Sequence, residues 1–267
     1  AQQYAITYND NSKTGGTIPN TTLKVHGTNA TIASNSCNRT GYTANGWNTK
    51  TDGTGTAYAN GATYATNANL ALYLAWTPNT DTAYKVEHYV MNISGTYPAT
   101  ATKTTTGKGT TATSLTLANL KDASLEVAGG IAYAHATVGG STVTTTTILA
   151  DGSLVVKLYY ARAQHTLTTV YGNGDANGTG TYYYEKEITL PTKTYAGYTF
   201  AGTYTLSPTT TGASISGNTF TMGTADVTVT YNWVANTITI TLDNQNANSA
   251  GSAEVFYKYN TNTYYSN

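Results

Sequence analysis

Four histidines and one cysteine are the residues of this chain whose side chains most often perform chemistry in proteins. The histidines are scattered, with no pair at metal-ligand spacing and no cysteine cluster beside them. The cysteine has no general base near it in sequence, and no Gly-x-Ser-x-Gly motif is present. We therefore predict no catalytic residue, no metal site and no cofactor, and packing roles for His88 and Cys37. The histidines are His26, His88, His135 and His165.

Two acidic groupings could also carry chemistry. Glu185 and Glu187 would share one face of a strand, and we interpret them as surface charges rather than as a glycosidase pair. The loop from Gly172 to Gly178 places side-chain oxygens on alternate residues, as calcium loops do. It contains one carboxylate, so the sequence favours a turn over a calcium site.

The composition excludes several classes of partner. Charged residues make up 10% of the 267 residues, against roughly 25% in ordinary soluble domains, and the formal net charge is zero. A polyanion needs a concentrated basic face, so we predict no nucleic-acid partner. No run of about 18 apolar residues exists, so we predict no membrane span. A neutral surface lets copies of the chain approach each other closely.

Apolar residues alternate in segments that recur along the chain, which is the period of half-buried strands. Opening segments occupy residues 4–8, 84–89, 165–171 and 237–242, and closing segments occupy 70–76, 154–160 and 227–233. The spacing predicts a mostly β tandem array. Its parts are module 1 (1–78), module 2 (79–162, with a short helix near 117–126), module 3 (163–235) and an incomplete C-terminal segment (236–267).

Modules 1 and 3 share a Gly-Tyr-Thr-x-x-Gly element. In module 1 it lies within Arg39–Trp47, followed by Asp52–Tyr58 and the closing Leu72–Trp76, and this arrangement resembles the Listeria-Bacteroides repeat, also called the internalin B-type B repeat. Module 3 is similar, although Tyr204 stands where the family often has tryptophan. Module 2 lacks the element and is similar to mucin-binding-type repeats. The resemblance implies small β-grasp-like (ubiquitin-like) repeat domains in secreted or wall-attached proteins, and no enzymatic activity.

The physical role of the shared element can be argued from its residue types. Its glycines can adopt positive φ at either end of a short strand. We predict that Tyr42 and Tyr198 anchor the core, with a ligand-binding aromatic as the alternative. The glycines are Gly41, Gly46, Gly197 and Gly202.

The C-terminal segment repeats the first half of module 3 and has no closing strand. Half of such a domain exposes unpaired backbone, so we predict that another copy of the chain completes it by strand addition. The alternative is a longer protein whose chain continues past this segment, and both interpretations stay open. The candidate subunit-subunit residues are Thr237, Ile238, Ile240, Leu242, Val255, Phe256, Tyr257 and Tyr259.

These observations predict an extracellular or cell-surface structural protein, either a surface stalk or a self-assembling filament subunit joined head to tail. The alternative is an adhesin that binds a glycan or a host protein through tyrosine-rich strand faces. An enzyme would require a pocket with converging ionisable groups, which the sequence does not assemble.

Overall fold

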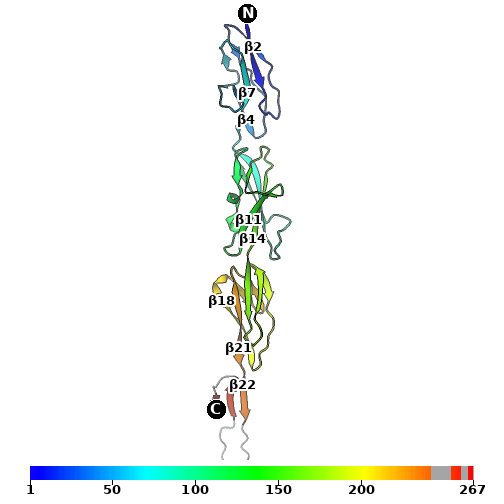
Figure 1. Cartoon of the computed structure of the whole chain (residues 1–267), viewed down its shortest axis with the longest axis vertical. Helices are drawn as coiled ribbons and strands as arrows, with labels where there is room; N and C mark the ends of the chain where they lie inside the picture. Colours follow the sequence, from blue (N-terminus) through cyan, green and yellow to red (C-terminus); the bar gives the residue numbers. More distant parts are fainter. Residues whose placement is uncertain (242–253, 260–263, 267) are drawn as a thin grey trace, which may run out of the picture. The chain divides into compact units, whose positions relative to one another are not determined.

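The protein is mostly β, as the sequence predicts, in a computed structural model that describes residues 1–241, 254–259 and 264–266 (Figure 1). These residues include no α-helix and three short 3₁₀ helices: η1 (Leu117–Leu120), η2 (Ala123–Leu125) and η3 (Thr209–Thr211). The short helix predicted near 117–126 therefore exists as two 3₁₀ turns, and Leu117 in the first of them is fully buried.

The chain divides into two compact units. Unit 1 holds Ala1–Tyr89, Ala101–Lys121 and His135–Leu158, and unit 2 holds Val90–Thr100, Asp122–Ala134 and Tyr159–Asn267. All of the sheets of module 1 belong to unit 1. Those of module 3 and of the C-terminal segment belong to unit 2, and module 2 supplies residues to both.

Module 1 is built on a five-stranded sheet in the order β2-β1-β7-β4-β5. Its opening and closing strands, β1 and β7, are parallel neighbours at the centre, and the other pairs are antiparallel. A two-stranded ladder, β3 with β6, adds a second layer. The strands are β1 (Gln3–Asn9), β2 (Thr22–Val25), β3 (Ala30–Thr31), β4 (Tyr42–Asn48), β5 (Ala57–Tyr58), β6 (Thr63–Tyr64) and β7 (Leu70–Pro78).

The core of module 1 forms on the inner face of this sheet. Alternate residues of β1 and β7 are buried, as the two-residue period requires. Trp47 of β4 fills the centre with no exposed surface, and its ring lies 4.8 Å from that of Tyr8. The indole N–H of Trp47 donates a hydrogen bond to the Ala33 carbonyl at 2.8 Å, so the buried polar atom is satisfied.

Module 3 repeats this arrangement. Its main sheet has the order β16-β15-β21-β18, and β15 and β21 are again the parallel opening and closing strands. A three-stranded sheet, β17-β20-β19, packs a second set of apolar residues into the same core. The strands are β15 (Gln164–Val170), β16 (Gly178–Tyr183), β17 (Glu187–Thr189), β18 (Tyr198–Ser207), β19 (Ser214–Ser216), β20 (Thr219–Thr221) and β21 (Val227–Ala235).

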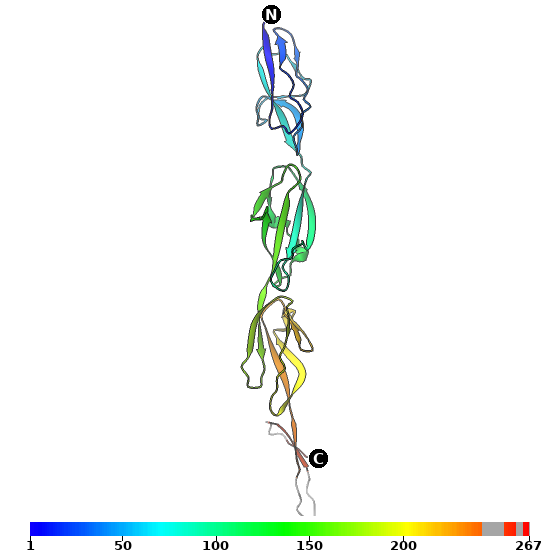
Figure 2. The same ribbon diagram turned by 90° about the vertical axis from the view of Figure 1, so that its right-hand side faces the viewer.

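A bulge in β4 and another in β18 determine which aromatic residue enters each core. Residues 45–46 of β4 face the single residue 75, whereas residues 201–203 of β18 face the single residue 232. After the bulges, Trp47 pairs with Leu74 and Tyr204 pairs with Tyr231. The extra residue in β18 therefore brings Tyr204 to the position that Trp47 has in module 1, and the bend of β18 is visible in yellow in Figure 2.

Module 2 contains a five-stranded sheet in the order β12-β11-β14-β8-β9, and β10 pairs with β13 beside it. Its predicted opening and closing segments form β8 and β14. Within the described residues, each opening and closing segment predicted from alternation contains a strand. The strands of module 2 are β8 (Thr82–Val90), β9 (Lys103–Gly109), β10 (Ser114–Thr116), β11 (Ile131–Val138), β12 (Ser141–Thr142), β13 (Thr145–Thr147) and β14 (Val155–Arg162).

The predicted positive φ angles of the shared element are confirmed: Gly41 has 74°, Gly46 82°, Gly197 81° and Gly202 72°. At Gly46 an added Cβ would lie 2.6 Å from the carbonyl oxygen of Tyr58. This position therefore excludes a side chain for two reasons, the backbone conformation and the lack of space.

Replacing Gly46 with alanine is expected to lower the free energy of unfolding by more than the roughly 1–2 kcal/mol that left-handed backbone costs a residue with a Cβ. Gly53 is the matched control, because its φ is 78° and an added Cβ would meet nothing within 4 Å. Urea denaturation followed by tryptophan fluorescence would compare the two variants. Equal losses for Gly46→Ala and Gly53→Ala would contradict the steric argument.

Candidate functional site

His88 and Cys37 have the packing roles predicted for them. His88 is 1% exposed, and its Nε2 lies 3.1 Å from the hydroxyl of Thr105. Cys37 belongs to the core of module 1, where burial raises the pKa of its thiol. A thiol with a raised pKa is a weak nucleophile at neutral pH, because little of it is ionised.

The acidic groupings also serve the fold, although one prediction about them is wrong. Glu185 does not lie on a strand with Glu187: it has a φ of 64° in the turn before β17 and accepts a hydrogen bond from Arg162 at 2.6 Å. In the loop 172–178, Asp175 binds Lys193 at 2.9 Å, and this contact lowers the pKa of the Asp175 carboxyl. Lys193 therefore pairs with the single carboxylate of the loop that resembles a calcium-binding loop in sequence.

No cluster of three histidine, cysteine, aspartate or glutamate side chains suited to a metal ion occurs among the described residues. Within the same part of the chain, no helix has the length and apolar character needed to span a membrane.

The C-terminal segment forms a three-stranded antiparallel sheet in the order β22-β23-β24. Ile238 pairs with Tyr257 and Ile240 with Val255, so the two predicted segments come together in register. Ile238 and Ile240 are 45% and 44% exposed. Leu242 lies outside the described residues. The strands are β22 (Thr237–Thr241, with candidates Thr237, Ile238 and Ile240), β23 (Glu254–Lys258, with candidates Val255, Phe256 and Tyr257) and β24 (Tyr264–Ser266).

One edge of this sheet differs from the corresponding edge of modules 1 and 3. Both β1 and β15 pair in parallel with a closing strand, but among the described residues β22 pairs with β23 alone. The added strand β24, which the sequence did not predict, pairs with β23 at the far edge. Tyr259, after β23, packs within the chain: its ring lies 5.5 Å from that of Tyr198.

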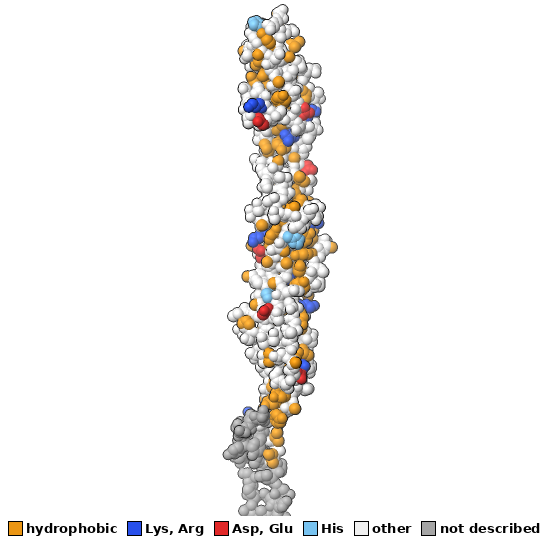
Figure 3. All heavy atoms as spheres, in the orientation of Figure 1, with side chains coloured by type: hydrophobic (Ala, Val, Ile, Leu, Met, Phe, Trp, Pro, Cys, Tyr) orange, Lys and Arg blue, Asp and Glu red, His pale blue; other side chains and the backbone are white. Residues whose placement is uncertain are grey.

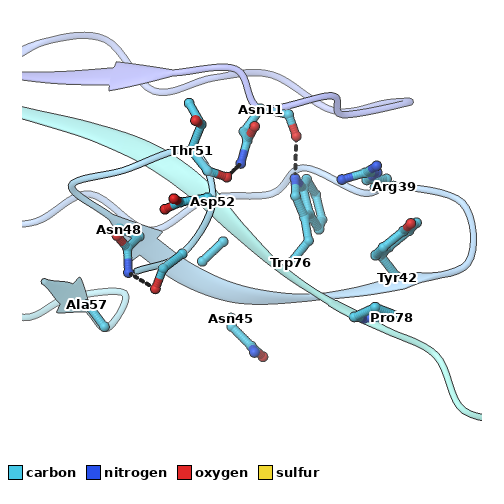
Figure 4. A pocket seen from close by; sticks show the side chains of 12 residues that line it. Asn11, Arg39, Tyr42, Asn45, Asn48, Thr51, Asp52, Ala57, Trp76 and Pro78 are labelled. Carbon is cyan, nitrogen blue, oxygen red and sulfur yellow. Dashed lines mark hydrogen bonds between the residues drawn. The ribbon is translucent and has the colours of Figure 1, made fainter. Parts of the chain in front are cut away.

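A hollow of about 370 Å³ lies in module 1, at the end of β4 and β7 (Figure 4). Figure 4 shows Trp76 between two groups of side chains: Arg39, Tyr42 and Pro78 on one side, and Asn11, Thr51 and Asp52 on the other. Asn45, Asn48, Gly53, Ala57 and Ala75 complete the lining.

Buried Asn48 shapes one wall of the hollow. Its amide accepts hydrogen bonds from the N–H groups of Lys50 and Gly55, at 2.9 and 3.0 Å, and donates one to the Gly53 carbonyl at 3.0 Å. Asn11 ties the same loop to β7, because its side-chain N–H₂ donates to the carbonyls of Thr51 and Leu74, each at 2.8 Å. These hydrogen bonds hold the 48–55 loop together and tie it to β7.

The prediction that Tyr42 anchors the core is wrong. Tyr42 pairs with Pro78 at the end of β7, beyond the bulge, and the Arg39 guanidinium covers its ring at 3.9 Å. The core position belongs to Trp47. Tyr198 is likewise outside the core of module 3 and stacks on Tyr195 at 4.2 Å. Charged side chains are few on the face shown in Figure 3, and Arg39 and Asp52 are the charged residues that line the hollow.

Tyr231 provides a pH-dependent feature in the core of module 3. Its hydroxyl donates a hydrogen bond to the Pro191 carbonyl at 2.6 Å, and burial, assisted by Tyr204 and Tyr171, raises its pKa to about 12. The folded state thus holds this proton more tightly than the unfolded state, whose tyrosine pKa is about 10. The contribution of the Tyr231 proton to the free energy of unfolding is complete below pH 10 and is lost as the pH rises toward 12.

We therefore expect the free energy of unfolding of the wild type to fall more steeply between pH 10 and pH 12 than that of Tyr231→Phe. Urea denaturation at several pH values would measure both slopes. At pH 8 the variant should be less stable, because it lacks the hydrogen bond to Pro191. Identical alkaline slopes for the two proteins would contradict the assignment.

Comparison with protein families gives a match that covers part of module 1. No curated protein matches the sequence. The family whose model does match is found in bacterial surface proteins and is a structural repeat family rather than an enzyme family. Residues 4–73, from β1 into β7, match the Listeria-Bacteroides repeat domain, the family that the sequence motifs of module 1 resemble.

Proposed function

We propose that this chain is an extracellular structural protein, a surface stalk or filament subunit whose copies join head to tail by strand addition of the C-terminal segment. The match of residues 4–73 to a family of bacterial surface proteins supports the extracellular location. The repeated parallel pairing of opening and closing strands supports β-grasp-like folds for modules 1 and 3.

The observation that carries the proposal is the open edge of β22. The same edge of β1 and of β15 is filled by a parallel closing strand, and in the described residues nothing fills it on β22. Exposed Ile238 and Ile240 lie on this strand. An unpaired edge with apolar side chains favours pairing with a further strand, and a second copy of the chain would supply one.

Removal of residues 236–267 tests this assignment. The full chain is expected to form filaments that negative-stain microscopy and sedimentation detect, and the shortened chain is expected to remain unassembled. Filaments formed equally by both proteins would disprove strand addition through this segment, and so would the absence of assembly in the full chain.

A substitution pair refines the test without removing a strand. Ile238→Thr together with Ile240→Thr keeps side chains suited to a strand and removes apolar surface, so assembly should weaken. Val234→Thr on β21 is the matched control, because Val234 is 56% exposed but lies outside the C-terminal segment. Equal weakening by the control would assign the effect to general surface hydrophobicity.

An adhesin is the second candidate, but its contact surface would differ from the tyrosine-rich strand faces that the sequence suggested. Among tyrosines whose side chains are described, Tyr259 alone is exposed, at 38%, and the others are buried or half-buried. Tyrosine-rich strand faces are therefore poor candidates for contact with a partner. The feature that favours a binding function is the hollow beside Trp76.

A further inference from the structure

Modules 1 and 3 place a tryptophan at the same position of the closing strand. The indole N–H of Trp76 donates to the carbonyl of Asn11 at 2.5 Å, and that of Trp233 donates to the carbonyl of Tyr171 at 2.6 Å. In both modules the acceptor lies just after the opening strand. The two indole N–H groups thus make equivalent hydrogen bonds, so the residues around the two rings can be compared directly.

In module 3 the ring of Trp233 is covered by other aromatic side chains. Tyr195 stacks on Tyr198 and meets Trp233 edge-on, with ring centroids 5.7 Å apart. Phe200 and Tyr231 lie within 5.7 and 6.4 Å of the same ring. The apolar surface of Trp233 is therefore used within the fold.

In module 1 the ring of Trp76 has no aromatic neighbour among the described residues, and it borders the hollow. The residue that corresponds to Tyr195 is Arg39: each lies three residues before the tyrosine of the shared element and forms a backbone bridge to it. The Arg39 guanidinium lies over the Tyr42 ring, as Tyr195 lies over Tyr198, and makes no ring contact with Trp76 among the described residues. The ring contact that Tyr195 makes with Trp233 therefore has no counterpart at Trp76, and the hollow lies beside that side chain.

Polar groups with unused hydrogen-bonding capacity surround this aromatic surface. The Oδ1 atom of Asn11 accepts no hydrogen bond from the described residues. Asp52 uses only Oδ1, which accepts from the N–H and hydroxyl of Thr54, and its second oxygen remains available. The Arg39 guanidinium forms no ion pair with the described residues and rests on the Tyr42 ring.

We propose that this hollow is a saccharide-binding site for a short stretch of a neutral glycan, seated on Trp76. A sugar ring presents C–H groups that pack on an aromatic face and a rim of hydroxyls that both donate and accept hydrogen bonds. The hollow is bordered by the ring of Trp76 together with an amide oxygen, a carboxylate and a guanidinium, which match both features. Its volume falls in the usual range of small-molecule sites, about 300–1,000 Å³.

The charge of the lining favours a neutral ligand over an acidic one. Arg39 and Asp52 are its only charged members, and they are of opposite sign. An acidic sugar would gain from the first and be repelled by the second, whereas hydroxyl groups hydrogen-bond to both. This inference does not depend on assembly through the C-terminal segment, so either proposal can fail without the other.

The test uses the full chain, a glycan array, and titration of tryptophan fluorescence with four probes: cellotriose, mannotriose, chitotriose and, as the acidic probe, sialyllactose. Arg39→Tyr is the decisive variant, because it removes the guanidinium from the lining, introduces the side chain that contacts the tryptophan in module 3 and should leave the fold intact. Asp52→Ala removes a rim acceptor. Asp151→Ala is its matched control, since Asp151 accepts the same pair of hydrogen bonds from Ser153 in a turn outside the hollow.

We expect at least one neutral probe to bind, and Arg39→Tyr and Asp52→Ala to weaken that binding by about tenfold or more. Asp151→Ala should bind as the wild type does. Far-UV circular dichroism and urea denaturation confirm that Arg39→Tyr is folded. The proposal is overturned if no neutral glycan binds on the array or in solution, if only acidic glycans bind, or if folded Arg39→Tyr binds as tightly as the wild type.

Discussion

Replacing Trp47 with alanine is expected to destabilise module 1 by about 3–5 kcal/mol, the usual cost of removing a large aromatic side chain from a core. Trp47 has no exposed surface, packs against Tyr8 and donates to the Ala33 carbonyl. The variant loses the ring contacts and also leaves the part-buried Ala33 carbonyl without its donor. Hydrogen exchange of the full chain, read by mass spectrometry, should show loss of protection in β1, β4 and β7.

Tyr204 supplies the reciprocal variant for this experiment. It occupies the corresponding place in module 3, opposite Tyr231, with ring centroids 4.8 Å apart. Tyr204→Ala should raise exchange in β15, β18 and β21 and leave module 1 protected. If Trp47→Ala raised exchange equally across module 3, the division of the chain into separately stabilised modules would be wrong.

Removing the amide of Asn67 is expected to cost module 1 about 1–3 kcal/mol, because it leaves a buried polar group without its main partner. The ammonium group of Lys24 is 2.6 Å from Oδ1 of Asn67, and Lys24 is only 1% exposed. The same oxygen accepts the N–H of Gly27 at 3.1 Å. The remaining contacts of the ammonium are a 3.5 Å approach to the Val25 carbonyl and the face of the Tyr4 ring, at 5.6 Å.

Two variants decide this prediction: Asn67→Ala, which removes the hydrogen-bond acceptor, and Lys24→Met, which removes the charged group. Lys24→Met keeps the aliphatic stem packed and should cost less than Asn67→Ala, because it leaves no buried charge behind. Adding Lys24→Met to Asn67→Ala should restore part of the lost stability. Thermal and urea denaturation of the three variants would measure these effects, and additive losses in the double variant would contradict the coupling.

The strands of this protein were predictable because their burial follows a two-residue period. Ile6 and Tyr8, like Leu72 and Leu74, alternate with more exposed residues, so a local pattern reports the structure directly. The positive φ of Gly46 was predictable for a similar reason, because few other residues adopt it readily. The predictions of the four module boundaries stay predictions.

The errors arose where a regular pattern is interrupted. The bulge at residues 45–46 brings Trp47 opposite Leu74 and into the core, whereas Tyr42 is outside the core because it pairs with Pro78, at the end of β7. Glu185 adopts positive φ although it is not a glycine, and nothing in its neighbourhood signals that turn. The three-residue strand β24 is too short to carry a periodic signal.

The hollow beside Trp76 could not be assembled from sequence, because its walls come from residues 11, 39–57 and 75–78. The available signal was a difference between repeats. Arg39 stands where module 3 has Tyr195, and this difference has meaning only once the structure shows that Tyr195 contacts a tryptophan and that Arg39 lines the hollow beside another one.

The parallel pairing of β1 with β7 has a mechanical consequence. Residues 6–9 lie beside residues 70–73 and run in the same direction, so the chain enters and leaves the central pair at opposite ends. Tension applied through the two ends of module 1 loads this ladder lengthwise, and its hydrogen bonds must break together by shear rather than one after another by peeling. Such a connection resists pulling along the line that joins the two ends of the module.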